Sequence, residues 1–170
     1  MADIAAGRLR TDDNLQGGVE EIYFFNYVAG AFTVTANVAT AIDSGLTAVY
    51  KYEIQGDGNT FTESNVVDKK TGTSVNTQTL VAQLKQVNSA TNVELDKLLQ
   101  GRNSAVYKDS NDQYRWIALK GFNVTSTGEL VTGGARADFN GYNVTLVAEQ
   151  KGYSPSLDAS TVTALLALVA

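Results

Sequence analysis

The chain of 170 residues contains no cysteine and no histidine. Their absence excludes disulfides, thiolate nucleophiles, Cys/His zinc sites and every acid–base scheme that relies on an imidazole. Stability must therefore come from core burial or from neighbouring subunits. Proline is nearly absent as well, and the single one, Pro155, is expected to end the folded part of the chain.

Charge is also scarce. Charged residues make up 18% of the chain and hydrophobic residues 44%, a composition typical of a folded soluble protein with one well-buried core. The 13 Lys and Arg residues face 18 Asp and Glu residues, which gives a net charge of −5. Because an acidic protein repels phosphate backbones, gripping nucleic acid is not its expected function. Such a balance suits a surface that DNA must pass without sticking.

Neither end reads as a targeting or membrane segment. The N-terminus lacks the basic start and apolar run of a signal peptide. Residues 159–170 are apolar but fall short of the roughly 20 residues that span a bilayer. We therefore expect synthesis in the cytoplasm and no membrane partner. Residues 155–170 are expected to be an apolar tail, with Ser160 as a candidate helix cap.

One interior segment, Thr91–Gly101, carries the signals of a helix. Thr91 and Glu94 have the spacing of a capping box. An apolar stripe at helical spacing is formed by Leu95, Leu98 and Leu99. Gly101 follows where a helix commonly closes with a left-handed residue. We therefore expect one short helix, with these leucines buried, covering an edge or face of a β domain.

Most of the remaining chain alternates with the period of a β-strand. The predicted strands are Val19–Val28, Phe32–Ala39, Ala48–Gln55, Phe61–Asp68, Thr73–Val87, Ala105–Lys108, Gln113–Leu119, Phe122–Thr127 and Tyr142–Glu149. Val19–Val28 is apolar on both faces, so both must be covered, either within a sandwich or by another copy of the chain. In the last strand Tyr142, Val144, Leu146 and Ala148 are predicted to face inward.

The strand predicted over Thr73–Val87 is unusually long, and its first half is polar on both faces. A strand that outruns its core belongs to a projecting hairpin, expected over Gln55–Gln78, where contact with another subunit is expected. The predicted fold is mainly β: an antiparallel β-sandwich or barrel with one flanking α-helix. It comprises an N-terminal arm (residues 1–18), the β-sandwich domain (19–154) and the C-terminal tail (155–170).

The search for chemistry is negative. Asp109–Asp112 matches half of a calcium loop, but it lacks the glycine and glutamate that complete the pattern, so we predict a hairpin turn. The same applies to Asp57–Asn59. Glu20 and Glu21 are adjacent on a strand and are expected to face opposite sides. The sequence therefore predicts no catalytic residues, no cofactor-binding residues, no metal ligands and no enzyme.

Several weaker motifs also have plain readings. Asn123 and Asn143 each begin an Asn-Val-Thr glycosylation pattern, which chance explains better without a signal peptide. Gly133–Arg136 lacks the Lys-Ser/Thr ending of a phosphate loop. Two alternatives to a structural role stay open. One is an enzyme with Asp/Glu or Ser/Lys groups converging in a pocket, and the other is a glycan-binding β-module that exposes Trp116 and several tyrosines on one face.

An ordered set of motifs runs along the chain, namely Gly17–Phe24, Tyr50–Glu53, Phe61–Glu63, the long strand Gly72–Leu84, the short helix before Gly101-Arg102, Tyr107–Tyr114, and the closing Thr132-Gly133 and Asp138–Tyr142. This set resembles the tail-tube-type subunits of bacteriophage virions. It covers most of the chain. Asp112-Gln113 stands where Asn-Gly is usual, a departure that touches only a turn.

The resemblance implies a β-sandwich or barrel that pairs sheets with its neighbours into homo-oligomeric rings, expected to be hexameric. Stacked through long loops and terminal arms, the rings would form a hollow conduit for the genome, in contact with other phage tail proteins and located in the virion tail. DNA would pass the lumen transiently. Related ring, connector, terminator and baseplate proteins remain alternatives.

Overall fold

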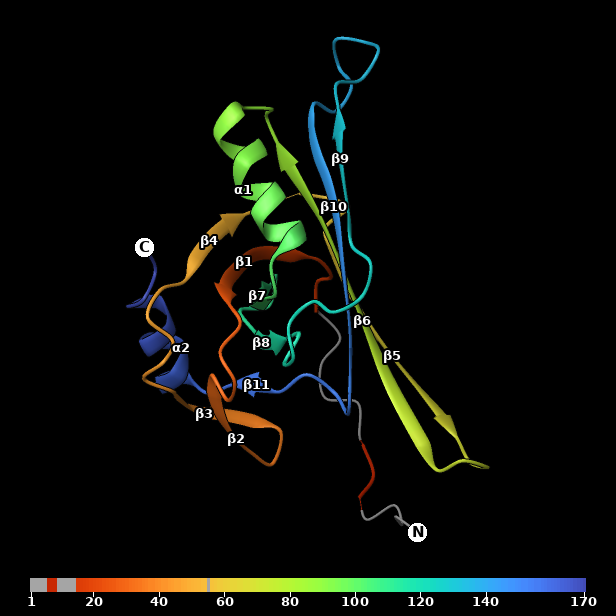
Figure 1. Ribbon diagram of the computed structural model, residues 1–170, viewed down its shortest axis with the longest axis vertical. Coiled ribbons are helices and arrows are strands. Elements are labelled where there is room, and N and C mark those ends of the chain that lie inside the picture. Colours follow the sequence, from red (N-terminus) through yellow and green to blue (C-terminus); the bar gives the residue numbers. More distant parts are fainter. Residues whose placement is uncertain (1–5, 9–14, 55) are drawn as a thin grey trace.

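A computed structural model describes residues 6–8, 15–54 and 56–170. The fold is mainly β, with two packed sheets and two helices (Figure 1). Within the described residues the strands are β1 (Val19–Asn26), β2 (Phe32–Thr35), β3 (Val38–Ile42), β4 (Tyr50–Glu53), β5 (Thr60–Asp68), β6 (Thr73–Lys85), β7 (Asn103–Asp109), β8 (Tyr114–Ile117), β9 (Thr127–Val131), β10 (Gly141–Gln150) and β11 (Ser156–Leu157). The helices are α1 (Ser89–Gln100) and α2 (Ala159–Leu166).

The strands form a seven-stranded sheet in the order β2-β3-β11-β8-β7-β1-β4 and a four-stranded sheet in the order β5-β6-β10-β9. Pairing is antiparallel except between β11 and β3. The predicted β-sandwich with a flanking helix is confirmed. The C-terminal residues, for which Ser160 was a candidate helix cap, form a second helix beyond the one predicted inside the chain.

The first core lies between the two sheets and beneath α1. Its buried members include Ile22, Phe24, Leu80, Leu95, Leu98, Tyr107, Ile117, Tyr142, Val144 and Leu146. Burial of Tyr142, Val144, Leu146 and Ala148 confirms the predicted inward face of the last long strand. Leu95 and Leu98 are buried as predicted, and Leu99 packs against the same cluster.

The ends of α1 differ from the prediction. The N-cap is Asn88, whose side-chain oxygen accepts a hydrogen bond from the Thr91 N–H at 2.7 Å, so Thr91 is a helical residue and no capping box forms. Glu94 pairs instead with Lys97. Gly101 has a φ of −80° and is not left-handed. Glycine is needed there for space, because a Cβ atom would lie 2.6 Å from the Lys97 carbonyl oxygen.

A similar close approach fixes α1 against the four-stranded sheet. A Cβ atom at Gly128 of β9 would lie 2.8 Å from a methyl group of Leu99. A residue with a side chain here would require the Leu99 side chain to shift.

A second core covers the other face of the seven-stranded sheet. It contains Tyr23, Phe25, Phe32, Ala39, Val49, Val106, Trp116 and Leu165. Leu165 belongs to α2, so the tail fills the face that β1 presents away from the first core. Both faces of β1 are therefore covered within one chain.

The expectation that the fold ends at Pro155 is accordingly wrong. The β11 strand inserts between β3 and β8, and α2 follows at once. The N-cap of α2 is Asp158, whose side chain accepts from the Thr161 N–H at 2.7 Å, and not the predicted Ser160. Residues 155–170 are thus a part of the domain.

Two other predicted strands are wrong in detail. The segment predicted as one strand over Phe32–Ala39 is a hairpin, with β2 and β3 joined at Ala36 and Asn37, whose φ values are 50° and 63°. The segment Phe122–Thr127 is irregular, and β9 begins only at Thr127.

The long hairpin is confirmed. β5 pairs with β6 in unbroken register from Thr60 opposite Val81 to Asp68 opposite Thr73, and the pair extends beyond the body of the molecule (Figure 1). Near its end, Val66, Val67 and Val75 are 66%, 57% and 43% exposed. We call residues 66–75 the hairpin tip. Gln55, the first residue of the predicted hairpin, lies outside the described residues.

Most of the predicted N-terminal arm, namely residues 1–5 and 9–14, also lies outside the described residues. The base of the arm is attached to the β7–β8 turn. The Gln16 N–H donates to the Asn111 side chain at 3.0 Å, and the Ser110 hydroxyl donates to the Gly17 carbonyl at 3.2 Å.

Candidate functional site

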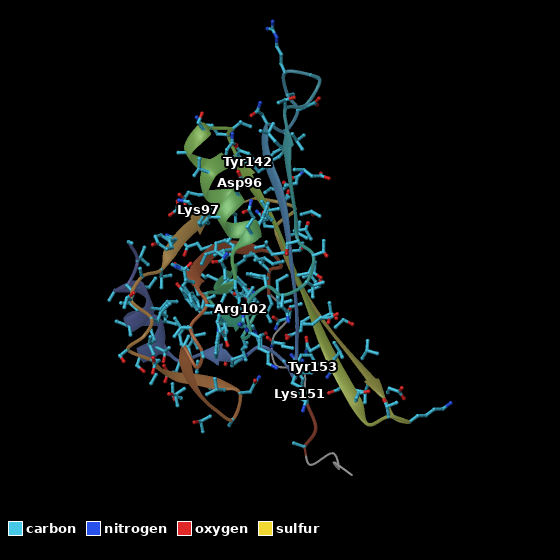
Figure 2. The ribbon with its side chains drawn as sticks, in the orientation of Figure 1. Asp96, Lys97, Arg102, Tyr142, Lys151 and Tyr153 are labelled. Atoms are coloured by element: carbon cyan, nitrogen blue, oxygen red, sulfur yellow. The ribbon has the colours of Figure 1, made fainter. Side chains whose placement is uncertain are left out.

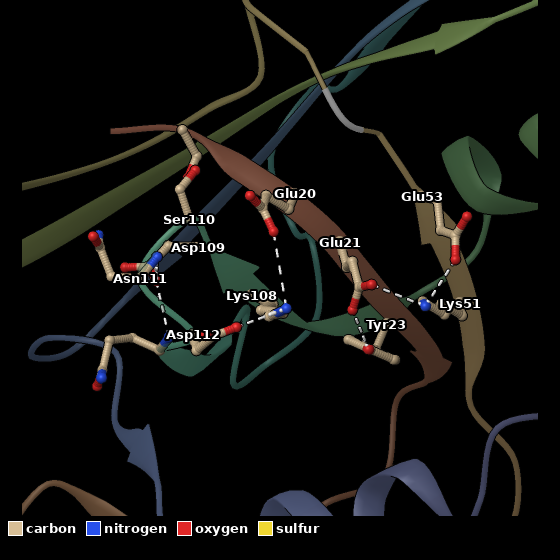
Figure 3. A network of polar contacts seen from close by, with 12 residues as sticks. Glu20, Glu21, Tyr23, Lys51, Glu53, Lys108, Asp109, Ser110, Asn111 and Asp112 are labelled. Atoms are coloured by element: carbon tan, nitrogen blue, oxygen red, sulfur yellow. Dashed lines mark hydrogen bonds and ion pairs between the residues drawn. The ribbon is translucent and has the colours of Figure 1, made fainter. Parts of the chain in front are cut away.

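The polar groups on β1, β4 and β7 form ion pairs and do not converge on a reacting position (Figure 3). The Lys51 ammonium lies 2.9 Å from a Glu21 carboxylate oxygen and 2.8 Å from a Glu53 oxygen. Glu20 lies 3.8 Å from Lys108, which is also 2.8 Å from Asp112. The expectation that the two adjacent glutamates face opposite sides is wrong, because the register of β1 shifts between Val19 and Glu21 and both carboxylates lie on the face of Lys108. Their nearest cations differ, Lys51 for Glu21 and Lys108 for Glu20.

The pKa values in this network follow from those contacts. Burial alone would raise the pKa of Glu21, but the hydrogen bond from the Tyr23 hydroxyl and the ion pair with Lys51 outweigh it and lower the pKa. Burial and the same carboxylate raise the pKa of Tyr23. The pKa of Lys51 is raised by its bonds to Glu53 and Glu21. Each group is held in its ordinary charge state, which is the opposite of what proton-transfer catalysis requires.

An open groove of about 780 Å³ lies between α1 and the ends of β1 and β4. Its charged groups are already engaged. Lys97 pairs with Glu94 at 2.7 Å. Arg102, labelled in Figure 2, places its guanidinium 3.8 Å from the centre of the Tyr27 ring and donates to the Lys120 carbonyl. Among the described residues, no group of three or more Asp and Glu side chains is placed to hold a metal ion.

The turn motifs have structural roles. The Asp109 side chain accepts hydrogen bonds from the N–H groups of Asn111 and Gln113, both at 2.9 Å, which confirms the predicted hairpin turn. Asn59 is buried in the Asp57–Asn59 turn, and its side-chain oxygen accepts from the Gln83 N–H at 2.8 Å. In the loop after β9, the Asp138 carboxylate accepts hydrogen bonds from the N–H groups of Gly134 and Ala135.

The aromatic residues do not form an exposed platform. Trp116 is 4% exposed, and its ring centre lies 4.9 Å from that of Phe32 in the second core. Tyr23, Tyr107 and Tyr142 are buried as well. The glycan-binding alternative depended on exposure of Trp116, and that feature is absent.

The four-stranded sheet is the most distinctive surface. Its covered face packs on the first core, as the burial of Leu80, Ala82, Val144 and Leu146 shows. Figure 1 places the seven-stranded sheet and both helices together on one side of this sheet. The opposite side, which we call the uncovered face, carries the alternate side chains Thr60, Thr62, Ser64, Val66, Val75, Thr77, Thr79, Val81, Gln83, Asn143, Thr145, Val147, Thr127 and Val131.

Both edges of the seven-stranded sheet are protected against pairing with another chain. β2 has four residues and a register shift between Thr33 and Val34. β4 also has four residues, of which Lys51 and Glu53 are charged. The chain's own C-terminal residues pair with the start of β4, since the Val49 N–H donates to the Leu168 carbonyl and the Ala170 N–H donates to the Val49 carbonyl, both at 3.0 Å.

Part of β10 is protected in another way. β9 pairs with β10 only from Gly141 to Thr145. Beyond it, the Asn123 side chain accepts from the Glu149 N–H at 2.8 Å and donates to the Glu149 carbonyl at 3.1 Å. The Ser126 hydroxyl accepts from the Val147 N–H at 3.2 Å. Side chains thus replace the missing partner strand.

The edges of the four-stranded sheet have fewer of these devices, since the charged residues are Glu63 and Asp68 on β5 and Glu129 on β9. β5 is nine residues long, contains neither lysine nor proline, and pairs with β6 without a bulge. Its glutamate, Glu63, points to the covered face, where it accepts from the Ser154 N–H at 2.8 Å and the Ser154 hydroxyl at 2.9 Å. β9 likewise has no lysine or proline. Within the described residues, no strand pairs with the outer edge of either.

The sequence predicted the hairpin but not these edges. The sequence of β5 could have indicated an open edge, because it lacks the lysine and proline residues that hinder pairing at a sheet edge. β9 was missed because Gly128 and Glu129 are residues that are depleted in strands.

No helix in the described part of the chain is long and apolar enough to cross a membrane. No protein-family model, curated protein or solved structure matches this chain.

Proposed function

We propose that this protein is a structural subunit of a phage tail tube, assembling into rings that stack as a hollow conduit for the genome. The observation that carries the proposal is the contrast between edges. The chain protects β2, β4 and the exposed part of β10, yet leaves β5 and β9 open on opposite sides of one sheet. An unprotected, flat edge strand is a template for pairing with another chain.

The order of the four strands suits head-to-tail addition. Neighbours in the sheet β5-β6-β10-β9 are all antiparallel, so β5 and β9 run in opposite directions. When a second copy in the same orientation places its β5 beside β9, the new pair is also antiparallel. A repeated head-to-tail contact closes into a ring if the rotation between copies allows it.

The hairpin tip favours contacts between rings. It extends away from the body and exposes three valines beside the lysines of its turn, Lys69 and Lys70. Apolar residues on a projecting hairpin favour a site of association. This agrees with the resemblance to tail-tube subunits, which implies stacking through long loops.

Two features of the sequence that suggested contact with neighbouring subunits do not support the proposal. The doubly apolar β1 and the apolar tail both need cover, and they cover each other within one chain. The proposal therefore rests on the β5 and β9 edges and on the hairpin.

The proposal includes homo-oligomeric, hexameric rings, a location in the virion tail after synthesis in the host cytoplasm, contact with other tail proteins, and no catalysis. A connector, terminator or baseplate ring would use the same edges without continuous stacking.

Electron microscopy of the purified protein after negative staining tests the proposal, together with its mass in solution. We expect rings or tubes. A strictly monomeric protein at high concentration, with neither rings nor tubes, would overturn the proposal.

A pair of proline variants tests the edge. Asn65→Pro lies on the exposed β5 strand, where proline is tolerated in a monomer but hinders pairing with a further strand. Val34→Pro, on the protected β2 edge, is the matched control. We expect Asn65→Pro to stay folded and monomeric while Val34→Pro still assembles. Equal assembly of both folded variants would rule out pairing through β5.

A further inference from the structure

We infer that Glu63 holds the β5 edge in the form that pairs with a second copy, and that it does so only after residues 151–170 have folded onto the domain. The inference rests on the proposed function, because it concerns the regulation of the pairing edge. It gives the chain an order of events, in which the C-terminal residues fold before the subunits assemble.

The first observation is the set of hydrogen bonds around the Glu63 carboxylate, on the covered face of β5. One oxygen accepts from the Ser154 N–H at 2.8 Å and from the Gln78 amide at 2.7 Å, and the other accepts from the Ser154 hydroxyl at 2.9 Å. Ser154 is completely buried. We call Glu63, Gln78 and Ser154 the clasp. Hydrogen bonds to a carboxylate are among the stronger ones in proteins, so the clasp holds β5 firmly.

The clasp connects β5 to the seven-stranded sheet in two ways. The Gln78 side-chain oxygen accepts from the N–H of Ala118, directly after β8, at 2.8 Å. The Ser154 carbonyl accepts from the Arg115 guanidinium of β8 at 3.3 Å. The second connection passes through the C-terminal residues, so the clasp is complete only when Ser154 is in place.

The position of Glu63 along the strand makes the clasp important for the edge. In the described part of the chain, the β5 backbone pairs only with β6, and this pair extends beyond the body (Figure 1). At the far end of β5, the Asp68 carboxylate accepts from the N–H groups of Lys70 and Thr71 in its own turn. Within the described residues, Glu63 is therefore the outermost β5 residue whose side chain bonds outside the hairpin.

Without Ser154 the edge is less well ordered. Glu63 is only partly exposed, and a carboxylate that loses its donors there is destabilised and turns toward water. The β5 strand is then attached to the domain through β6 and through Phe61, whose ring centre lies 4.7 Å from that of Tyr107. A strand that is not fixed must be ordered during association, and the entropy lost weakens binding between copies. Docking of residues 151–170 therefore strengthens pairing through β5.

The order of synthesis gives this dependence a use. Ser154 lies 91 positions after Glu63, so β5 is made long before its partner in the clasp. An ordered, open edge strand on an unfinished chain is a site of aggregation. A clasp that requires Ser154 restricts ordered pairing to chains that already contain the C-terminal residues.

Substitutions at Glu63 test the clasp. Glu63→Ala removes all its side-chain hydrogen bonds. Glu63→Gln can keep them, because its oxygen accepts from the Ser154 N–H and from Gln78 while its NH2 group donates to the Ser154 hydroxyl. Ser154→Ala, which loses the hydroxyl bond alone, is a milder variant. Val106→Ala leaves a cavity in the second core and is the matched control for a general loss of stability.

Two measurements are needed. The first is amide hydrogen exchange in monomers, kept below the concentration at which the wild type assembles. In Glu63→Ala we expect the β5 N–H groups that bond to β6 to exchange roughly tenfold faster or more, relative to those of β10. The second is the protein concentration at which rings appear by electron microscopy, which should rise roughly tenfold or more. Ser154→Ala should shift both in the same direction, and Glu63→Gln and Val106→Ala should stay near the wild type.

The outcomes separate the inference from the proposed function. If Glu63→Ala assembles at the wild-type concentration, or impairs assembly no more than Val106→Ala, the inference is overturned while the proposed function stands. Failure of Glu63→Gln to restore assembly would also overturn it. If the wild type forms neither rings nor tubes, the proposed function fails, and hydrogen exchange alone then decides whether the clasp fixes β5.

Discussion

The Asn123 side chain bonds to both backbone groups of Glu149, at 2.8 Å from its N–H and 3.1 Å to its carbonyl oxygen. One amide thus does at the edge of β10 what a neighbouring strand would do. We expect Asn123→Ala to lose roughly 1–2 kcal/mol of unfolding free energy, because two backbone groups lose their partner. Chemical denaturation measures this. A destabilisation matched by Asn140→Ala, whose side chain makes no such pair, would contradict the assigned role.

Asn123→Ala should also affect association. The variant exposes a third unprotected edge, so we expect non-specific aggregation in addition to ordered rings. Light scattering during purification would detect it. Unchanged scattering with unchanged assembly would show that the edge needs no protection.

The stripe of leucines on α1 gives a prediction about folding. Leu98 is buried in the first core, and Leu98→Asp places an unpaired charge there, at a cost of about 3–5 kcal/mol. Because that is a large part of a typical domain's stability, we expect the monomer to unfold. Circular dichroism measures the loss of structure. Val93→Asp on the exposed side of α1 is the control and should fold; if Leu98→Asp also folded and assembled, the packing of α1 described above would be wrong.

The hairpin tip gives a prediction about stacking. Val66 and Val75 face each other across the two strands and are exposed. We expect the double variant Val66→Ser, Val75→Ser to keep its thermal stability and to form rings but not tubes. Size-exclusion chromatography with electron microscopy separates the two products. Tubes of normal length would exclude the tip from contacts between rings.

The C-terminal helix contributes to the stability of a single chain. Leu165 is completely buried in the second core, so Leu165→Ala should cost about 2–5 kcal/mol through lost burial and the cavity left behind. Leu166→Ala, a substitution at a 43% exposed neighbour, should cost much less. Denaturant titrations compare the two. Equal effects would mean that α2 does not pack as described.

The Glu21 network predicts a dependence on acid. The folded pKa of Glu21 lies below 4.5, so its contribution is present above the unfolded pKa and is lost as the pH falls through the folded one. We expect the wild type to lose more stability than Glu21→Gln between pH 5 and the folded pKa. Unfolding free energies measured across that range test this, and parallel pH profiles would remove Glu21 from the explanation.

Much of the fold follows from local pattern, because burial imposes a period on the sequence. The alternation in Tyr142–Glu149 and the spacing of Leu95, Leu98 and Leu99 predicted which side chains are inside. The turn at Asp109 was predictable because its side chain bonds to the backbone within the turn itself.

The missed features depend on competition or on distant contacts. Asn88 and Thr91 are both residue types that can cap a helix. Asn88 is the cap because the helix begins soon after β6 ends. The hairpin at Ala36 was hidden because alanine seldom adopts a positive φ. The tail was misread because its cover, the Tyr23 and Phe25 face of β1, lies more than a hundred positions away in the sequence.

The close approach of Leu99 to Gly128 bears on the speed of assembly. Because Leu99 of α1 lies against β9 within the single chain, we expect this strand to be ordered before a second copy binds in the proposed ring. The entropy lost on fixing its backbone is then a cost of folding, and it does not oppose association. A bulkier residue at position 128 would displace the Leu99 side chain or β9, and we expect rings then to form more slowly even where the finished ring is equally stable.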